Sequence, residues 1–139
     1  MSDTTPAPDL FPSGPWTGFF LYPSEPGRYQ MELRLTFAAG RMSGNGRDCV
    51  GEFTVEGVYD DADGKCSFTK RYVGRHAVHY TGFNEGKGIW GTWMLSRVKG
   101  GFHIWPEGMA DPTVQHLSEE ADEPIEVEDT NRKRQPIGG

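Results

Sequence analysis

Nine residues, 87–95, constrain the fold of this chain more than any other stretch, and they read Lys-Gly-Ile-Trp-Gly-Thr-Trp-Met-Leu. Ile89, Gly91, Trp93 and Leu95 alternate with the residues between them, and a period of two is typical of a β-strand. Two glycines and two tryptophans would make a poor helix. Glycines inside an aromatic strand indicate a backbone that bends sharply or lies close beneath a large ring, which is common in small closed barrels.

The same alternation recurs along the chain and predicts an all-β protein. Of the 139 residues, 19 are glycine and 10 are proline, and 12% are aromatic, so many turns accompany many rings. Eight strands are expected, at 16–22, 28–37, 41–45, 52–59, 65–72, 76–83, 87–95 and 102–105. Each connection is short enough for a hairpin, so neighbouring strands should be antiparallel. Because closure removes exposed edges, we expect an eight-stranded antiparallel up-and-down barrel, either filled by side chains or holding one small ligand.

Composition divides the chain into three expected segments. Residues 1–13 are predicted to be disordered, residues 14–106 to form the barrel, and residues 107–139 to form an acidic, largely disordered tail. The tail has nine acidic and three basic residues against eleven of each in the rest, so it accounts for the whole net charge of -6. The neutral body argues against a nucleic-acid surface. No signal-peptide pattern or long apolar run is present, so we expect no membrane association.

Two short patterns resemble known barrel families. Gly14-x-Trp16 in the first expected strand and Gly91-x-Trp93-x-Leu95 in the seventh resemble the avidin and lipocalin barrels, the calycin-like group, over residues 14–106. Gly14-x-Trp16-x-Gly18 with Tyr22-Pro23 also resembles the nitrobindin-like haem barrels. The first resemblance implies a barrel that holds a small ligand. The second implies haem, for which His103 would be the axial ligand. No extended biotin or haem signature aligns and the lipocalin disulfides are absent, so no binding residue is carried over.

Lys70 is the most informative charged residue. It shares one face of its expected strand with Phe68 and Tyr72. If that aromatic face points inward, the ammonium group lies inside the barrel or at its mouth. A buried ammonium needs a partner, and Glu32, Glu56 or a ligand would serve.

Other polar residues cluster near the same hairpin. Lys70, Arg71, Arg75, His76 and His79 form a basic group that indicates either an anion-binding mouth or a solvated hairpin end. Aromatic rings are also more numerous than one small core needs, and a surplus of rings is typical of a ligand cavity. The candidate ligand-binding residues are Tyr22, Arg34, Tyr59, Lys70, Tyr72, His79, Trp90 and Trp93.

Two loops have patterns that suggest ligands. Residues 44–51 are glycine-rich, but no helix follows them, so a bulged strand corner in which Asp48 accepts from backbone amides is favoured over a phosphate loop. Asp60, Asp61 and Asp63 lack the spacing of a calcium loop and indicate a hairpin turn.

The two cysteines are expected to be reduced thiols in a cytoplasmic protein. If residues 61–64 form a turn, Cys66 faces residues near Val58 and Tyr59, and Cys49 lies about nine residues away, roughly 30 Å at strand rise. A disulfide needs Cα atoms within about 7 Å. We therefore expect no bond between Cys49 and Cys66.

No spacing of residues predicts a catalytic set, which favours a binding protein over an enzyme. The leading hypothesis is a non-enzymatic barrel with an aromatic-lined interior that binds a small molecule or a peptide, with no cofactor assigned. One alternative is a haem-binding or enzymatic barrel that uses His79 or His103 with Lys70. Another is an interaction protein acting through its tail, where residues 124–129 resemble a SUMO-interacting motif suited to strand addition to a protein partner, although a solubilising tail is favoured.

Overall fold

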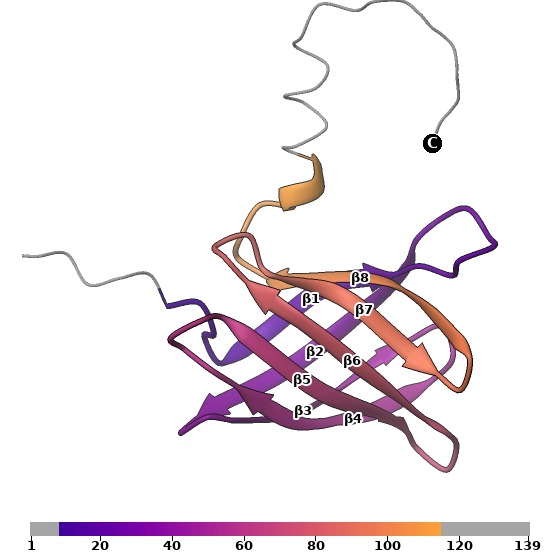
Figure 1. The fold of residues 1–139 in the computed structure, drawn as a ribbon, viewed down its shortest axis with the longest axis horizontal. Coiled ribbons are helices and arrows are strands. Elements are labelled where there is room, and N and C mark those ends of the chain that lie inside the picture. The colour runs from indigo at the N-terminus through magenta and orange to yellow at the C-terminus, as the bar shows by residue number, and fades with distance from the viewer. Residues whose placement is uncertain (1–8, 115–139) are drawn as a thin grey trace, which may run out of the picture. The chain divides into compact units, whose positions relative to one another are not determined.

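The computed structural model describes residues 9–114, and its eight strands close into one antiparallel barrel (Figure 1). The strands are β1 (Gly14–Phe20), β2 (Tyr29–Ala38), β3 (Arg41–Asp48), β4 (Glu52–Tyr59), β5 (Lys65–Tyr72), β6 (Ala77–Asn84), β7 (Ile89–Leu95) and β8 (Val98–Pro106). Each strand pairs with its neighbours in the chain, and β1 pairs with β8 through Gly18 and Ile104 to close the sheet. The predicted eight-stranded up-and-down barrel is confirmed.

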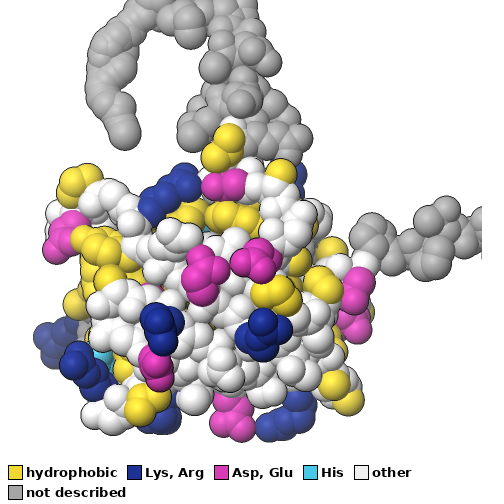
Figure 2. Space-filling model, turned by 180° about the vertical axis from the view of Figure 1, so that it is seen from behind, with side chains coloured by type: hydrophobic (Ala, Val, Ile, Leu, Met, Phe, Trp, Pro, Cys, Tyr) yellow, Lys and Arg dark blue, Asp and Glu magenta, His cyan; other side chains and the backbone are white. Residues whose placement is uncertain are grey.

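Alternation of side chains along each strand builds the core. In β2, Met31, Leu33 and Leu35 are buried, whereas Glu32 and Arg34 between them are exposed. Period-two side chains of a closed sheet have one inner and one outer face, so the alternating inner side chains of the eight strands share one interior, while Phe19 and Trp105 pack together outside that core cluster. Figure 2 shows that basic and acidic side chains are interspersed on one outer face of the molecule, with no large patch of a single sign.

Two strands are longer than the sequence predicted. β3 continues to Asp48, whereas we expected it to end at Asn45, and β8 begins at Val98 rather than at residue 102. The glycines that suggested loops lie within these strands because the neighbouring backbone is close. A Cβ atom on Gly44 would overlap the carbonyl oxygen of Arg34, and one on Gly100 would overlap that of Leu21. Here glycine permits close strand packing rather than a turn.

The segment before β1 closes one end of the barrel. Phe11 is 3% exposed, and its ring lies 4.8 Å from the ring of Tyr59. The indole of Trp16 donates to the carbonyl oxygen of Pro12 at 2.8 Å, and the amide of Asn84 donates to that of Leu10 at 2.6 Å. We expected the barrel to begin at residue 14, but residues 9–13 are packed against it. The opposite end of the barrel, which residues 9–13 do not cover, is called the open end.

Residues 109–114 belong to a second unit, distinct from the barrel. Residues 112–114 make one helical turn, and the carboxylate of Asp111 accepts from the backbone N–H of Thr113 at 2.8 Å. The helix start considered at His116 and the motif at 124–129 lie outside the described residues. Among residues 9–114, no helix is long and apolar enough to cross a membrane.

Candidate ligand-binding site

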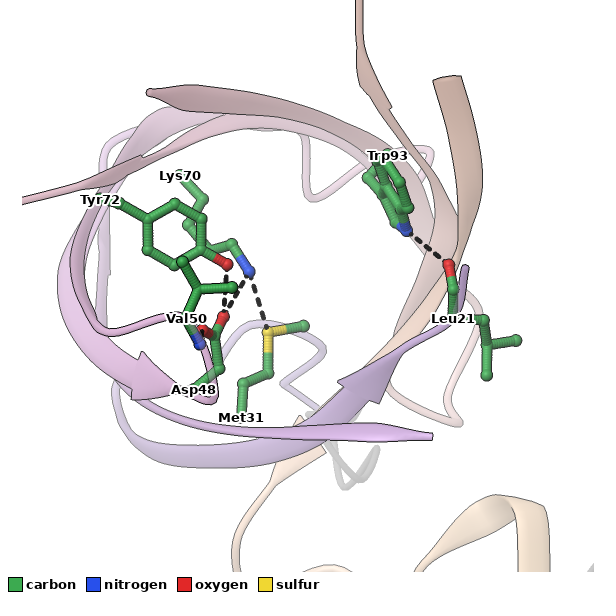
Figure 3. A network of polar contacts seen from close by, with 7 residues as sticks. All are labelled: Leu21, Met31, Asp48, Val50, Lys70, Tyr72 and Trp93. Carbon is green, nitrogen blue, oxygen red and sulfur yellow. Dashed lines mark hydrogen bonds and ion pairs between the residues drawn. The ribbon is translucent and has the colours of Figure 1, made fainter. Parts of the chain in front are cut away.

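Lys70 points into the barrel, as its aromatic strand neighbours suggested. Its side chain is 1% exposed, and its Nζ lies 2.7 Å from Oδ2 of Asp48, whose side chain is fully buried (Figure 3). We expected Glu32 or Glu56 as the partner, but both are exposed on the outer face of their strands. The partner is instead the last residue of β3, where the chain turns inward before β4.

Asp48 is held by three donors. Its Oδ2 accepts from Nζ of Lys70 and from the hydroxyl of Tyr72, each at 2.7 Å, and its Oδ1 accepts from the backbone N–H of Val50 at 2.9 Å. Backbone bonds in both directions between Asp48 and Gly51 close the corner. The expected contact of Asp48 with a backbone amide is confirmed. This carboxylate also neutralises the buried ammonium, which the sequence did not reveal.

Aromatic rings surround the ammonium on its other sides. Nζ of Lys70 lies 4.6 to 5.1 Å from the ring centroids of Phe20, Phe53, Tyr72 and Tyr80. A cation over ring faces at this distance is attracted by the ring quadrupoles. Burial lowers the pKa of Lys70, and the hydrogen bond with Asp48 opposes that shift. Burial and the bond to Asp48 raise the pKa of Tyr72.

A cavity of about 200 Å³ lies at the open end, where β5 and β7 end and β6 and β8 begin. We call it the mouth cavity. Its wall carries five aromatic rings, those of Phe20, Tyr22, Tyr72, Tyr80 and Trp93. The remaining lining side chains are those of Val50, His76, Val78, Leu95 and Val98. The orientation of Trp93 is set by its indole N–H, which donates to the carbonyl oxygen of Leu21 at 2.9 Å (Figure 3).

The structure brings together four of the eight candidate residues. Tyr22, Tyr72 and Trp93 line the mouth cavity, and the ammonium of Lys70 lies over three of its rings, those of Phe20, Tyr72 and Tyr80.

The other four candidates lie elsewhere. Tyr59 packs against Phe11 and Phe37 at the closed end. Arg34, His79 and Trp90 are on the outer face, where His79 contacts the hydroxyl of Ser67 at 3.3 Å.

The basic group at the β5–β6 hairpin does not form one surface. Lys70 is inside, Arg71 and Arg75 are exposed, and His79 is on the outer wall. His76 alone lines the mouth cavity, with its ring 5.1 Å from that of Tyr72.

Sequence reasoning missed Asp48, Phe20 and Tyr80 as parts of the site. Alternation in β6, where Val78 and Tyr80 are buried and His79 is exposed, carried the signal for Tyr80. No comparable signal identified Asp48, because it follows a stretch in which glycines hide the alternation.

Asp60, which was weighed as a calcium ligand, and His103, which was weighed as a haem ligand, both form contacts with nearby backbone atoms. Oδ1 of Asp60 accepts from the backbone N–H of Ala62 at 2.8 Å, as expected for a turn. Nε2 of His103 lies 2.6 Å from the carbonyl oxygen of Lys87, away from the mouth cavity. Within residues 9–114, no group of three or more His, Cys, Asp or Glu side chains is arranged to hold a metal ion. Both cysteines are free, as predicted.

In comparisons with known proteins, no protein-family model, no curated protein and no solved structure matches this chain. A larger hollow of about 910 Å³ lies on the outer wall over β4 to β7. Lys70, Asp48 and Asn84 have buried polar side chains, and none of these three residues lines this hollow.

Alkaline pH is expected to destabilise the barrel, in part through Cys66. Burial raises the pKa of this thiol from 9.0 to about 12, although a hydrogen bond with the backbone of Gly82 opposes the shift. In the unfolded chain the thiol ionises above about pH 9, so its contribution to stability is complete below that pH and is lost as the pH rises through the folded pKa. The loss is about 1.4 kcal/mol for each pH unit.

The measurement is urea denaturation of the wild type and Cys66→Ala at about pH 8 and pH 10. The raised pKa values of Tyr72 and Tyr80 act in the same direction in both proteins. The wild type should therefore lose more free energy of unfolding than Cys66→Ala. Equal losses would contradict a raised thiol pKa.

Proposed function

We propose that this protein is a non-enzymatic, calycin-like barrel that binds a small molecule in the mouth cavity. The observation that carries the proposal is an aromatic-walled cavity at one end of a barrel whose other end is closed by Phe11. Eight-stranded barrels are about wide enough to hold one small ligand. Ring-lined cavities with a few polar groups are the usual form of such sites.

The enclosure of the charged groups supports binding rather than catalysis. The ammonium of Lys70 and the carboxylate of Asp48 bind each other at 2.7 Å, and neither residue lines the mouth cavity. A catalytic acid or base must come within hydrogen-bond reach of the reacting group. Here the rings of Tyr72 and Tyr80 line the cavity, and the two charged groups contact these tyrosines without lining the cavity themselves. The charged groups therefore help to position the wall of the cavity.

The volume of the mouth cavity supports a small ligand. An apolar cavity of about 150 Å³ holds benzene, whereas pockets for drug-sized ligands measure about 300–1,000 Å³. A cavity of about 200 Å³ therefore suits one ring with a few substituent atoms. A macrocycle such as haem would need a much larger opening, and His79 and His103 lie outside the cavity.

Toluene tests this function, because it matches the size and apolar wall of the cavity. In the wild type, titration with toluene up to its solubility should shift the NMR signals of the Trp93 indole N–H and the Val78 methyl groups. Leu95→Trp places a large side chain in the cavity and should weaken toluene binding at least about tenfold, a change of about 1.4 kcal/mol.

Met94→Trp is the matched control. Met94 is the neighbour of Leu95 on β7 but points outward, and it is 52% exposed. This variant should bind toluene as the wild type does. If toluene leaves the signals of the lining residues unchanged in the wild type, the mouth cavity is not a site for small apolar molecules.

A further inference from the structure

Tyr80 has a buried hydroxyl group with no hydrogen-bond partner among residues 9–114. The residue is 1% exposed, its ring stacks on that of Phe68 at 4.9 Å, and it lines the mouth cavity. Burial raises the pKa of Tyr80, and the charges of Asp48 and then Tyr22 add to the shift. By contrast, the hydroxyl of Tyr72 donates to Asp48.

An unpartnered buried hydroxyl is unfavourable in itself. Leaving such a group without a hydrogen bond costs about 1–3 kcal/mol, and most buried polar side-chain atoms in proteins are partnered. A phenol has one donor, and its acceptor capacity is the less costly part to leave unused. The group that would satisfy Tyr80 from within the mouth cavity is therefore a hydrogen-bond acceptor.

The charge of the lining residues limits what this acceptor can belong to. In the described part of the chain, the residues that line the mouth cavity include no Asp, Glu, Lys or Arg. The nearest charges, on Lys70 and Asp48, already compensate each other at 2.7 Å. A charged ligand would be taken from water with no carboxylate, ammonium or guanidinium group of the lining to pair with it, which is strongly unfavourable. A neutral ligand meets no such penalty.

We propose that the mouth cavity selects a neutral, single-ring aromatic molecule with a carbonyl or ether oxygen that accepts a hydrogen bond from the hydroxyl of Tyr80. This inference rests on the proposed function and adds the chemical class of the ligand. The ring lies among the five aromatic side chains of the wall, and the oxygen faces Tyr80. Tyr22, which is half-buried in the same wall, offers a second hydroxyl near the opening.

Four probes of similar size test the proposal by calorimetric or NMR titration of the full chain. Acetophenone carries the acceptor, isopropylbenzene lacks it, and benzoate and benzylammonium carry opposite charges. Tyr80→Phe removes only the hydroxyl group. Acetophenone should lose about tenfold in affinity in Tyr80→Phe, the effect of one hydrogen bond of about 1.4 kcal/mol, whereas isopropylbenzene should bind both proteins alike.

A second measurement separates a ligand-binding hydroxyl from a structural one. Because the Tyr80 hydroxyl has no partner among the residues that the structure describes, Tyr80→Phe should not lower the melting temperature. Tyr72→Phe is the matched control, and it should lower the melting temperature because it breaks the bond to Asp48.

Each other outcome is decisive. Equal losses for acetophenone and isopropylbenzene in Tyr80→Phe would overturn the role of the hydroxyl, while the cavity would remain a binding site. Tighter binding of benzoate or benzylammonium than of acetophenone would overturn the preference for a neutral ligand. Failure of every probe, toluene included, would overturn the proposed function itself.

Discussion

Replacing Asp48 with alanine is expected to lower the free energy of unfolding by about 3–5 kcal/mol at neutral pH, because the ammonium of Lys70 is left buried without its counter-ion. Lys70 is 1% exposed, and its remaining neighbours are rings and the sulfur of Met31 at 3.8 Å. Tyr72 and the backbone N–H of Val50 lose their acceptor as well. Urea denaturation measures the change.

The pH dependence of Asp48→Ala identifies the charge on Lys70 as the cause. Burial lowers the pKa of Lys70 from 10.5, and the hydrogen bond and charge of Asp48 oppose this lowering. Loss of Asp48 should therefore lower the pKa of Lys70 further. Above the folded pKa the unfolded chain binds more protons than the folded barrel, so stability rises with pH until about 10.5, by about 1.4 kcal/mol per unit. The difference between wild type and Asp48→Ala should therefore shrink from about pH 7 to pH 9. A constant difference would show that the lost contacts are not electrostatic.

The double variant Asp48→Ala/Lys70→Met is the control for packing. Methionine keeps most of the volume of lysine without its charge, and replacing both members of a buried ion pair by apolar groups is often nearly neutral. The double variant should therefore be more stable than Asp48→Ala alone. If it is less stable by the sum of the single effects, Lys70 and Asp48 do not interact energetically.

Replacing Trp93 with alanine is expected to cost about 3–5 kcal/mol, as for other buried aromatic side chains. Trp93 is 4% exposed, packs edge-on against Tyr22 with ring centroids 5.7 Å apart, and anchors the carbonyl oxygen of Leu21. Its removal would enlarge the mouth cavity and leave that carbonyl without its indole donor. The free energy of unfolding from urea denaturation checks this value.

Trp90 provides the matched control on the same strand. Its side chain points outward, is 40% exposed, and contacts Phe83 with ring centroids 4.7 Å apart. Trp90→Ala should therefore cost less than about 1 kcal/mol, as most surface substitutions do. Similar costs for Trp90→Ala and Trp93→Ala would contradict the assignment of Trp93 to the interior.

Alternation in the sequence identifies which face of a strand a residue occupies. It places Lys70 on the same face as Phe68 and Tyr72, and the burial of all three shows that this face points inward. The same rule puts Arg34 outside, because Leu33 and Leu35 on either side of it are buried. Arg34 was therefore a wrong candidate for the ligand site, because the alternation in β2 already argued for the outer wall. The signal for this residue was present in the sequence.

Alternation does not determine the height of a residue along the barrel. Tyr59 and Tyr72 both belong to barrel strands, yet Tyr59 packs at the closed end and Tyr72 lines the mouth cavity. Height depends on the stagger between neighbouring strands, which the closed sheet sets as a whole. In β4 and β5 the register pairs Tyr59 with Cys66 and Phe53 with Tyr72.

The eight strands, their antiparallel order and the shared face of Lys70, Phe68 and Tyr72 could be predicted from the sequence, because each depends on local periodicity and on turns. Three-dimensional packing was needed to find that Asp48 neutralises Lys70, that Phe11 closes one end, and that the hydroxyl of Tyr80, which lines the mouth cavity, has no partner among residues 9–114. These contacts join positions far apart in the chain, such as Asp48 and Lys70, 22 residues apart. They form only when closure of the sheet brings the ends of different strands to the same height.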